Sequence, residues 1–339
     1  MQKKLTTGNL LDEKGRLSET GYAYELVKAY NRPAINASKY RIKEWDYHYV
    51  RSGEHGFGIT IADNGYMGLI GLAHMDFKNR TVNAKTKILL LTRGRFMLPC
   101  TTIDGDISLS EKGVYVNIGY ESDKTHLKLH WPGFYQEGPI TLEFTSVKPE
   151  SSMVLATPFK KDNQFYYNQK IIGMKTTGIF QIGDKKLQAD ANALTLLDFG
   201  RGVWPYRTQW YWGAAQGYQN GKRIGLNIGH GFGEQHNASE DMLFVDGKAH
   251  KLTHGRFTIQ KNDKGKPDYM EPWRYESEDG TMKLTFTPQL KRSDKTNLWI
   301  IKSDQNQVFG HYNGEIKLEK EIFKIESLPG FAEAFFNRW

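Results

Sequence analysis

Hydrophobic and polar residues alternate along most of the chain, with a period of two that begins after Trp45. Alternation of this kind predicts β-strands with one dry face and one wetter face. In the first part of the chain it is cleanest at residues 82–88, 114–118, 127–131 and 140–144, with further strand candidates at 165–172 and 178–182. The pattern returns at residues 224–228, 282–286 and 308–316. The chain is therefore predicted to be an all-β protein.

Short turn signals separate these predicted strands. Asp-Gly and Asn-Gly pairs are typical of tight hairpins, and they occur at Asp63-Asn64-Gly65, Asp104-Gly105, Asp246-Gly247, Asp279-Gly280 and Asn313-Gly314. Antiparallel strands joined by short turns leave exposed edges unless the sheet closes, which favours barrels. A length of 339 residues suits about two domains. We therefore expect two antiparallel β-barrels, residues 1–190 and 191–339, although no flexible linker marks the boundary.

One short helix is predicted near the N-terminus, over residues 18–31. Ser18 is a candidate N-cap, and Tyr22, Leu26 and Tyr30 recur at helical spacing before Pro33. A cap, an apolar stripe and a following proline are the usual signals of a helix.

Composition excludes several classes of protein. The longest aliphatic run, residues 88–91, is far shorter than the ~20 apolar residues of a membrane-spanning helix. The first residues lack the apolar stretch of a secretory signal, so a cytoplasmic location is expected. The single cysteine, Cys100, cannot form an internal disulfide or a thiolate metal cage.

The charge of the chain is basic but dispersed. The net charge is +8 without a run of five like charges, so a nucleic-acid partner is not expected. A solvated surface with a modest basic excess is the ordinary interpretation of such a charge. The alternative is a basic face that makes peripheral contact with a membrane of anionic lipid or binds an acidic ligand.

The segment 198–217 concentrates residue types that can carry chemistry. It contains one acid, two arginines, three tryptophans and two tyrosines, namely Asp198, Arg201, Trp204, Tyr206, Arg207, Trp210, Tyr211 and Trp212. In a regular strand Trp210 and Trp212 share one face and Tyr211 lies on the other. An acid beside aromatic faces could protonate an unsaturated ligand and stabilise the resulting cation. The alternative is an ion-paired aromatic corner that only stabilises the end of a barrel.

Two other segments are weaker candidates. Alternation places Trp45 and Tyr47 on one strand face, which is more typical of a core than of a ligand wall. Residues 229–241 contain two histidines and several carboxylates, but the spacing is not His-Glu-x-x-His and the glycines do not match a nucleotide fingerprint. We therefore expect neither a metal nor a cofactor.

Several motifs resemble a known family. They are TGNLLDEKGRL at 7–17, KEWDYHYV at 43–50, IADNGYMG at 61–68, the block 196–217, GLNIGHGFGE at 225–234, QVFGHYNGEI at 307–316 and GFAEAFFNRW at 330–339. On these motifs the chain is identified as a member of the uncharacterised microbial family of domain of unknown function 2804, over nearly its full length. More distantly it is similar to tandem lipocalin-like proteins, a group that includes AttH-like proteins, carotenoid and kievitone hydratases, tocopherol cyclases and fungal Diels–Alder cyclases.

The resemblance implies two calycin-type barrels side by side with an apolar pocket. Asp198 matches the acid of the hydratase branch, whereas Phe199 stands where that branch has a histidine. Trp210 and Trp212 match its tryptophan pair. The missing histidine makes a two-group acid/base mechanism doubtful but leaves ligand binding intact.

Two hypotheses of function remain open. In the first, the protein is a cofactor-independent enzyme that hydrates, isomerises or cyclises an apolar lipid or isoprenoid-like ligand. Asp198 is then the proton donor, Arg201 its orienting partner, and the ligand contacts are Trp45, Tyr47, Trp204, Tyr206, Arg207, Trp210, Trp212, Asn227 and His230. In the second, the same barrels carry a lipid or another apolar metabolite without chemistry, or serve as an interaction module.

Overall fold

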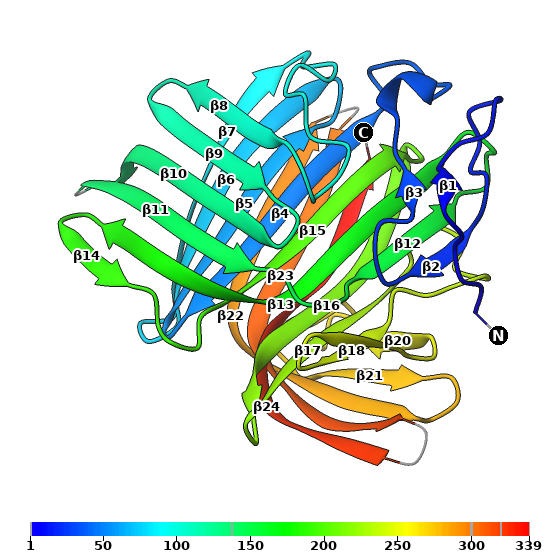
Figure 1. Cartoon of the computed structure of the whole chain (residues 1–339). Coiled ribbons are helices and arrows are strands. Elements are labelled where there is room, and N and C mark those ends of the chain that lie inside the picture. The colour runs from blue at the N-terminus through cyan, green and yellow to red at the C-terminus, as the bar shows by residue number, and fades with distance from the viewer. Residues whose placement is uncertain (1, 137, 299–300, 319–320, 339) are drawn as a thin grey trace.

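The computed structural model describes residues 2–136, 138–298, 301–318 and 321–338 (Figure 1). These residues form strands, turns and one 3-10 turn, η1 (Arg32–Ala34). The prediction of an all-β protein is therefore confirmed. No helix in the described ranges has the length and apolar character needed to cross a bilayer.

The first sheet has 13 strands, and its main path runs β7-β6-β5-β4-β15-β13-β11-β10-β9-β8. β12 and β14 pair with β13, and β2 pairs with β12. The strands are β2 (Gly21–Ala23), β4 (Lys43–Ser52), β5 (His55–Asp63), β6 (Met67–Asp76), β7 (Thr81–Leu90), β8 (Asp106–Glu111), β9 (Val114–Tyr120), β10 (Lys124–Tyr135), β11 (Gly138–Val147), β12 (Met153–Pro158), β13 (Phe165–Ile182), β14 (Lys185–Gln188) and β15 (Leu194–Val203). A separate parallel pair joins β1 (Gly8–Asn9) to β3 (Lys28–Ala29).

The second sheet has 9 strands in the order β19-β18-β17-β16-β24-β23-β22-β21-β20. They are β16 (Arg207–Gln219), β17 (Lys222–His230), β18 (Met242–Val245), β19 (Lys248–Lys251), β20 (Gly255–Thr258), β21 (Trp273–Ser277), β22 (Met282–Leu298), β23 (Ile301–Leu318) and β24 (Glu321–Arg338). Most neighbours are consecutive in the chain, as expected of hairpins.

Each sheet curls around its own core. Ile59 of β5 and Ile107 of β8 share one apolar cluster although they lie in opposite halves of the first sheet. In the second sheet Leu243 of β18 shares a cluster with Trp273 of β21. The hydrogen-bonded paths of the described residues end at β7 and β8 and at β19 and β20, so the sheets are near-barrels rather than fully closed ones.

A third apolar cluster joins the two sheets. Tyr47 and Tyr49 of β4 pack there against Trp212 of β16 and against Phe309 and Phe331 of the second sheet. These rings lie on the outer face of each near-barrel, because alternate residues of the same strands point into the separate cores. The junction between the sheets is therefore an aromatic layer.

The chain passes from the first sheet to the second at residues 204–206, between β15 and β16. The predicted division, after Asp190, lies before β15. β15 belongs to the first sheet because it pairs with β4 over Arg51↔Leu194 to Lys43↔Gly202. That pairing joins residues far apart in the chain, which local patterning does not reveal.

The helix predicted over residues 18–31 is wrong, since this segment contains β2 and β3. Tyr22 pairs with Leu155 of β12, and its backbone N–H donates to the Lys3 carbonyl at 2.9 Å. These distant partners satisfy the backbone groups that a helix would pair internally. The apolar spacing reflects separate burial of Tyr22 and Tyr30 against the neighbouring sheet.

The predicted turns at Asp63-Asn64-Gly65, Asp246-Gly247 and Asp279-Gly280 connect consecutive strands. The turn predicted at Asn313-Gly314 is wrong. These residues lie inside β23, where the register with β24 shifts between Tyr312 and Gly314. Gly314 has φ +142°, and a Cβ atom there would collide with the Lys283 carbonyl oxygen. The glycine therefore marks a bulge in a long strand.

Candidate functional site

β15 sends its chemically active side chains to opposite faces. Asp198 points to the junction between the sheets, where its carboxylate accepts a hydrogen bond from Trp45 Nε1 at 3.1 Å. Lys170 Nζ of β13 lies 3.2 Å from the same carboxylate. Residues three apart in a strand lie on opposite faces, so Arg201 points into the first near-barrel.

Arg201 has no exposed surface and forms an ion pair with Asp46 at 2.7 Å. It also donates to the carbonyl oxygens of Trp45 and Pro99, at 2.8 Å each. Its partner is thus Asp46 rather than Asp198, contrary to the expected orienting role. Strand alternation alone places the two side chains apart. Arg201 instead links β15 to Asp46 of β4 and to the Pro99 carbonyl.

Lys170 is the central cation of the junction. Its ammonium lies between Asp198, at 3.2 Å, and Glu240, at 3.6 Å. It also lies 3.5 Å from the centroid of the Trp212 ring, in a cation–π contact. Only 4% of the Lys170 side chain is exposed. Lys170 was not predicted from the sequence, although it lies within the strand candidate 165–172 and directly before Ile171 and Ile172. Its burial is notable because buried lysines are rare unless they are paired.

Glu240 faces Lys170 from the segment before β18. Asn227 of β17 donates to the Glu240 carbonyl at 2.8 Å and to its carboxylate at 3.3 Å. The same amide accepts a hydrogen bond from Trp212 Nε1 at 2.8 Å. Burial raises the pKa of Glu240 above its ordinary value, although the Lys170 charge opposes the shift. Asn227 therefore links Trp212, a predicted site residue, to Glu240, which was not predicted as one.

Glu333 of β24 is the third carboxyl group of the junction. It accepts a hydrogen bond from Gln307 Nε2 at 2.7 Å, and Gln307 also donates to Tyr47 Oη at 3.1 Å. Burial raises the pKa of Glu333 from 4.5 to about 8; the Lys170 charge opposes this shift and the Asp198 charge adds to it. Glu333 is therefore protonated at neutral pH.

These residues form what we call the junction cluster: Lys170, Asp198, Glu240 and Glu333. Three carboxyl groups face one ammonium, and a buried group of like charges holds a proton rather than ionise completely. The cluster draws on both sheets, because Lys170 and Asp198 come from the first and Glu333 comes from the second.

Aromatic rings cover one side of the junction cluster. Trp45 lies 4.9 Å from Trp204 and 6.5 Å from Trp210, measured between ring centroids. Phe232, from the loop after β17, contacts Tyr166 at 4.7 Å and Trp210 at 5.2 Å. The predicted tryptophans therefore do come together, and Trp210 and Trp212 share one face while Tyr211 packs in the second core.

Besides Arg201, three of the predicted site residues lie away from the junction. His230 stacks on Tyr211 inside the second near-barrel at 4.7 Å, and its Nε2 accepts the backbone N–H of Phe257 at 3.1 Å. Tyr206 and Arg207 are exposed at the connection between the sheets. Of the predicted residues, Trp45, Tyr47, Asp198, Trp204, Trp210, Trp212 and Asn227 belong to the junction.

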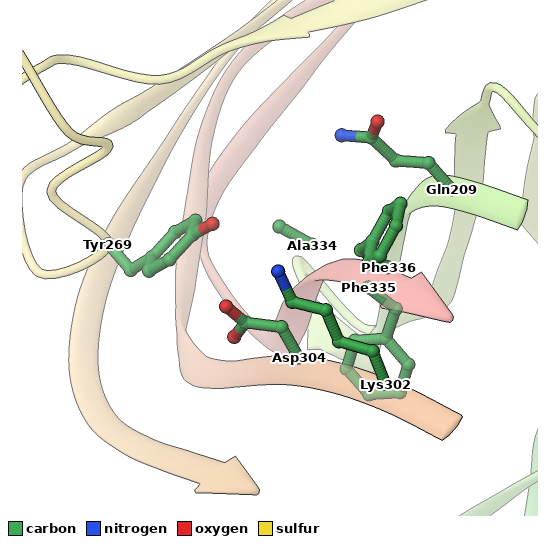
Figure 2. A pocket seen from close by; sticks show the side chains of 7 residues that line it. All are labelled: Gln209, Tyr269, Lys302, Asp304, Ala334, Phe335 and Phe336. Carbon is green, nitrogen blue, oxygen red and sulfur yellow. The ribbon is translucent and has the colours of Figure 1, made fainter. Parts of the chain in front are cut away.

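A cavity of about 250 Å³ opens at the mouth of the second near-barrel. Figure 2 shows the Tyr269 hydroxyl and the Lys302 ammonium pointing into this space, with Gln209 and Asp304 beside it. Gln209 is next to Trp210 in β16, so the two side chains lie on opposite faces of the strand. Within the described ranges, no group of three or more His, Cys, Asp or Glu residues is arranged to hold a metal ion.

Two curled antiparallel sheets packed against each other form a tandem lipocalin-like fold. The chain belongs to the family described as Domain of unknown function (DUF2804), whose model matches residues 2–339. The predictions of this family and of a tandem lipocalin-like fold are confirmed.

Three solved structures are similar to this chain, and the first of them supports the fold. An AttH-like protein from Nitrosomonas europaea is similar with a TM-score of 0.52 and 12% identity, over 92% of this chain and 97% of that one. Kievitone hydratase from Nectria haematococca has a TM-score of 0.46 and 11% identity, over 93% and 97%. CghA in complex with Sch210972 has a TM-score of 0.41 and 9% identity, over 97% of each chain. Among curated protein sequences, none matches this chain.

Proposed function

We propose that the protein is a cofactor-independent enzyme that protonates an apolar, unsaturated small molecule held between its two barrels. The observation that carries this proposal is the junction cluster itself. A lysine and three carboxyl groups are buried there against tryptophan rings, in a layer that both sheets build. Isolated structural ion pairs do not need a surplus of carboxyl groups, whereas acid catalysis needs one that keeps its proton.

Glu333 is the proton donor in this proposal, in place of Asp198. The carboxylate of Asp198 is the direct partner of Lys170 and Trp45, whereas Glu333 holds a proton at neutral pH. A buried carboxylic acid of this kind can serve as a general acid.

The reaction balances without a cofactor. The proton of Glu333 adds to one carbon of a double bond, whose π electrons form the new C–H bond and leave a carbocation on the other carbon. The faces of Trp210 and Trp212 stabilise that cation through their ring quadrupoles, and Lys170 balances the new Glu333 carboxylate. Glu333 then regains a proton, either from the water that attacks the cation or from a neighbouring carbon. The first route is a hydration and the second is an isomerisation.

The ligand reaches the cluster by displacing the Phe232 ring. Phe232 contacts Trp45, Tyr166, Trp204 and Trp210. It lies between Gly231, at φ +93°, and Gly233, at φ +85°. Both are left-handed positions that glycine adopts without strain, so the loop turns sharply on each side of the ring that covers the site.

The test compares the wild-type chain with Glu333→Gln, both purified from the native host and incubated with its lipid extract. Native mass spectrometry reports the bound molecule, and liquid chromatography with mass spectrometry reports conversion. We expect Glu333→Gln to retain the ligand but to lose about 10²–10⁴-fold in turnover, the usual contribution of a general acid. Glu326→Gln, an exposed glutamate of the same strand, is the matched control.

Other outcomes are equally informative. Equal conversion by Glu333→Gln and the wild type would show that Glu333 is not the acid. If the wild type bound a lipid and left it unchanged, the protein would be a carrier of apolar metabolites and not an enzyme.

A further inference from the structure

An exposed apolar tip is formed by the end of the edge strand β7 and the loop after it. Ile88 is 61% exposed, Leu90 74%, Leu91 52% and Met97 80%. Ile88 and Leu90 lie on the same face of β7, away from Leu89, which packs against the first core. Single exposed apolar residues are ordinary, but a gathering of large ones marks an interaction site. We call residues 88–97 the apolar tip.

The apolar tip is held in place by hydrogen bonds to a buried carboxylate. The buried Asp63 carboxylate accepts hydrogen bonds from the Thr92 hydroxyl at 2.7 Å and from the backbone N–H groups of Gly94 and Phe96 at 2.9 and 3.3 Å. Phe96 is 6% exposed and packs in the first core. The loop is therefore anchored from within while Leu91 and Met97 point outward.

The backbone of the apolar tip is strained at its exposed residues. Leu91 has φ +56°, Arg93 φ +54° and Met97 φ +47°. Residues other than glycine, asparagine and aspartate rarely adopt this left-handed region, and doing so costs folding energy. Leu91 and Met97 gain no burial in return. Such strain at exposed apolar side chains points to a role other than folding.

The charged residues of the chain segment that contains the apolar tip are all basic. No acidic residue occurs between Asp76 and Asp104. Arg93 and Arg95 are exposed within the tip, and Lys87 precedes it half-buried. Arg93 also stacks over the ring of Tyr40, with 4.7 Å between its guanidinium carbon and the ring centroid. The surface therefore combines protruding apolar side chains with flanking cations.

We propose that the apolar tip is a docking surface for an anionic lipid bilayer. Leucine and methionine side chains enter the boundary between headgroups and acyl chains, while the arginines and the lysine contact the negatively charged headgroups. An acidic protein or a nucleic acid would match the cations but leave the strained, exposed leucines without a role. The inference does not depend on the proposed enzymatic function.

Vesicle flotation of the full chain tests the apolar part of this proposal. We expect binding to vesicles of phosphatidylcholine with phosphatidylserine, weak binding to phosphatidylcholine alone, and release at high salt. The combined substitution Leu90→Asn, Leu91→Asn and Met97→Gln is expected to lower the partition coefficient by about tenfold or more. Ile322→Asn, at a residue 60% exposed in β24, is the matched control and is expected to change nothing.

A charge reversal tests the electrostatic part. Each cation near an anionic surface contributes about a fivefold increase in binding, so Arg93→Glu with Arg95→Glu is expected to lower it by at least about tenfold. Lys185→Glu with Lys186→Glu, on the exposed strand β14, changes the net charge equally and is expected to leave binding nearly unchanged.

Thermal unfolding separates function from folding. Leu91→Asn is expected to raise the midpoint of unfolding while it lowers vesicle binding, because asparagine adopts φ near +56° more readily than leucine. Absence of vesicle binding by the wild type, or equal losses in the tip variants and their controls, would overturn the proposal. So would binding of an acidic protein or a nucleic acid in place of vesicles.

Discussion

Replacing Arg201 by methionine is expected to lower the free energy of unfolding by about 3–5 kcal/mol. Arg201 and Asp46 have no exposed surface, and their ion pair measures 2.7 Å. Methionine fills part of the space but leaves the Asp46 carboxylate with one hydroxyl donor, Tyr120 Oη at 2.6 Å. A buried charge that loses its partner is strongly destabilising. Urea or guanidinium unfolding at neutral pH measures the loss.

Two further variants decide whether the loss has this origin. Arg207→Met removes an exposed arginine from the same aromatic segment and is expected to change stability by less than about 0.5 kcal/mol. Adding Asp46→Asn to Arg201→Met removes the buried charge that has lost its partner, and is expected to recover part of the stability. If Arg201→Met cost no more than Arg207→Met, the ion pair would not stabilise the protein.

Replacing Glu333 by glutamine is expected to stabilise the protein at alkaline pH. The pKa of Glu333 is raised from 4.5 to about 8 in the folded chain. Below 4.5 both states hold the proton, so its contribution does not vary with pH. Between 4.5 and about 8 the unfolded chain releases the proton and the folded chain keeps it, so the wild type loses stability as the pH rises.

The variant lacks this proton, so its stability advantage is expected to widen across that pH interval to a few kcal/mol, on the order that such a pKa shift implies. Lys170 and Asp198 face the same group, and both residues are kept in the variant. Unfolding titrations at several pH values, with Glu326→Gln alongside, measure the gap. A gap that stays constant between pH 4.5 and 8 would contradict the raised pKa.

Strand alternation is the sequence pattern that predicts most of the structure. It placed Trp210 and Trp212 on one face and Tyr211 on the other, as the structure has them. Applied to β15, the same rule separates Asp198 from Arg201, so the expected contact between them conflicted with a pattern already visible in the chain. Residue types suggested a pair that strand geometry does not allow.

The rest of the candidate site depends on long-range pairing. Asp198 meets Lys170 because β15 pairs with β13 in the register Lys170↔Asp198. Glu333 joins the junction because β24 pairs with β16, opposite Trp212. No local pattern encodes either pairing. Glu333 appears in the sequence only as one polar position in the apolar stretch 330–336, and Lys170 only as the last of three polar residues, 168–170. The wrong prediction of a helix at residues 18–31 has the same cause, since β2 in this segment pairs with β12, which lies far along the chain.

Infrared spectroscopy of the carboxylic acid C=O stretch tests the central claim most directly, because a carboxyl group protonated at neutral pH absorbs there and a carboxylate does not. We expect a band in the wild type at pH 7 that fades as the pH rises through about 8 and is much weaker in Glu333→Gln. Glu326→Gln should leave it intact. A spectrum without this band at pH 7, or a band of equal strength in Glu333→Gln, would contradict a proton stored on Glu333 between the barrels.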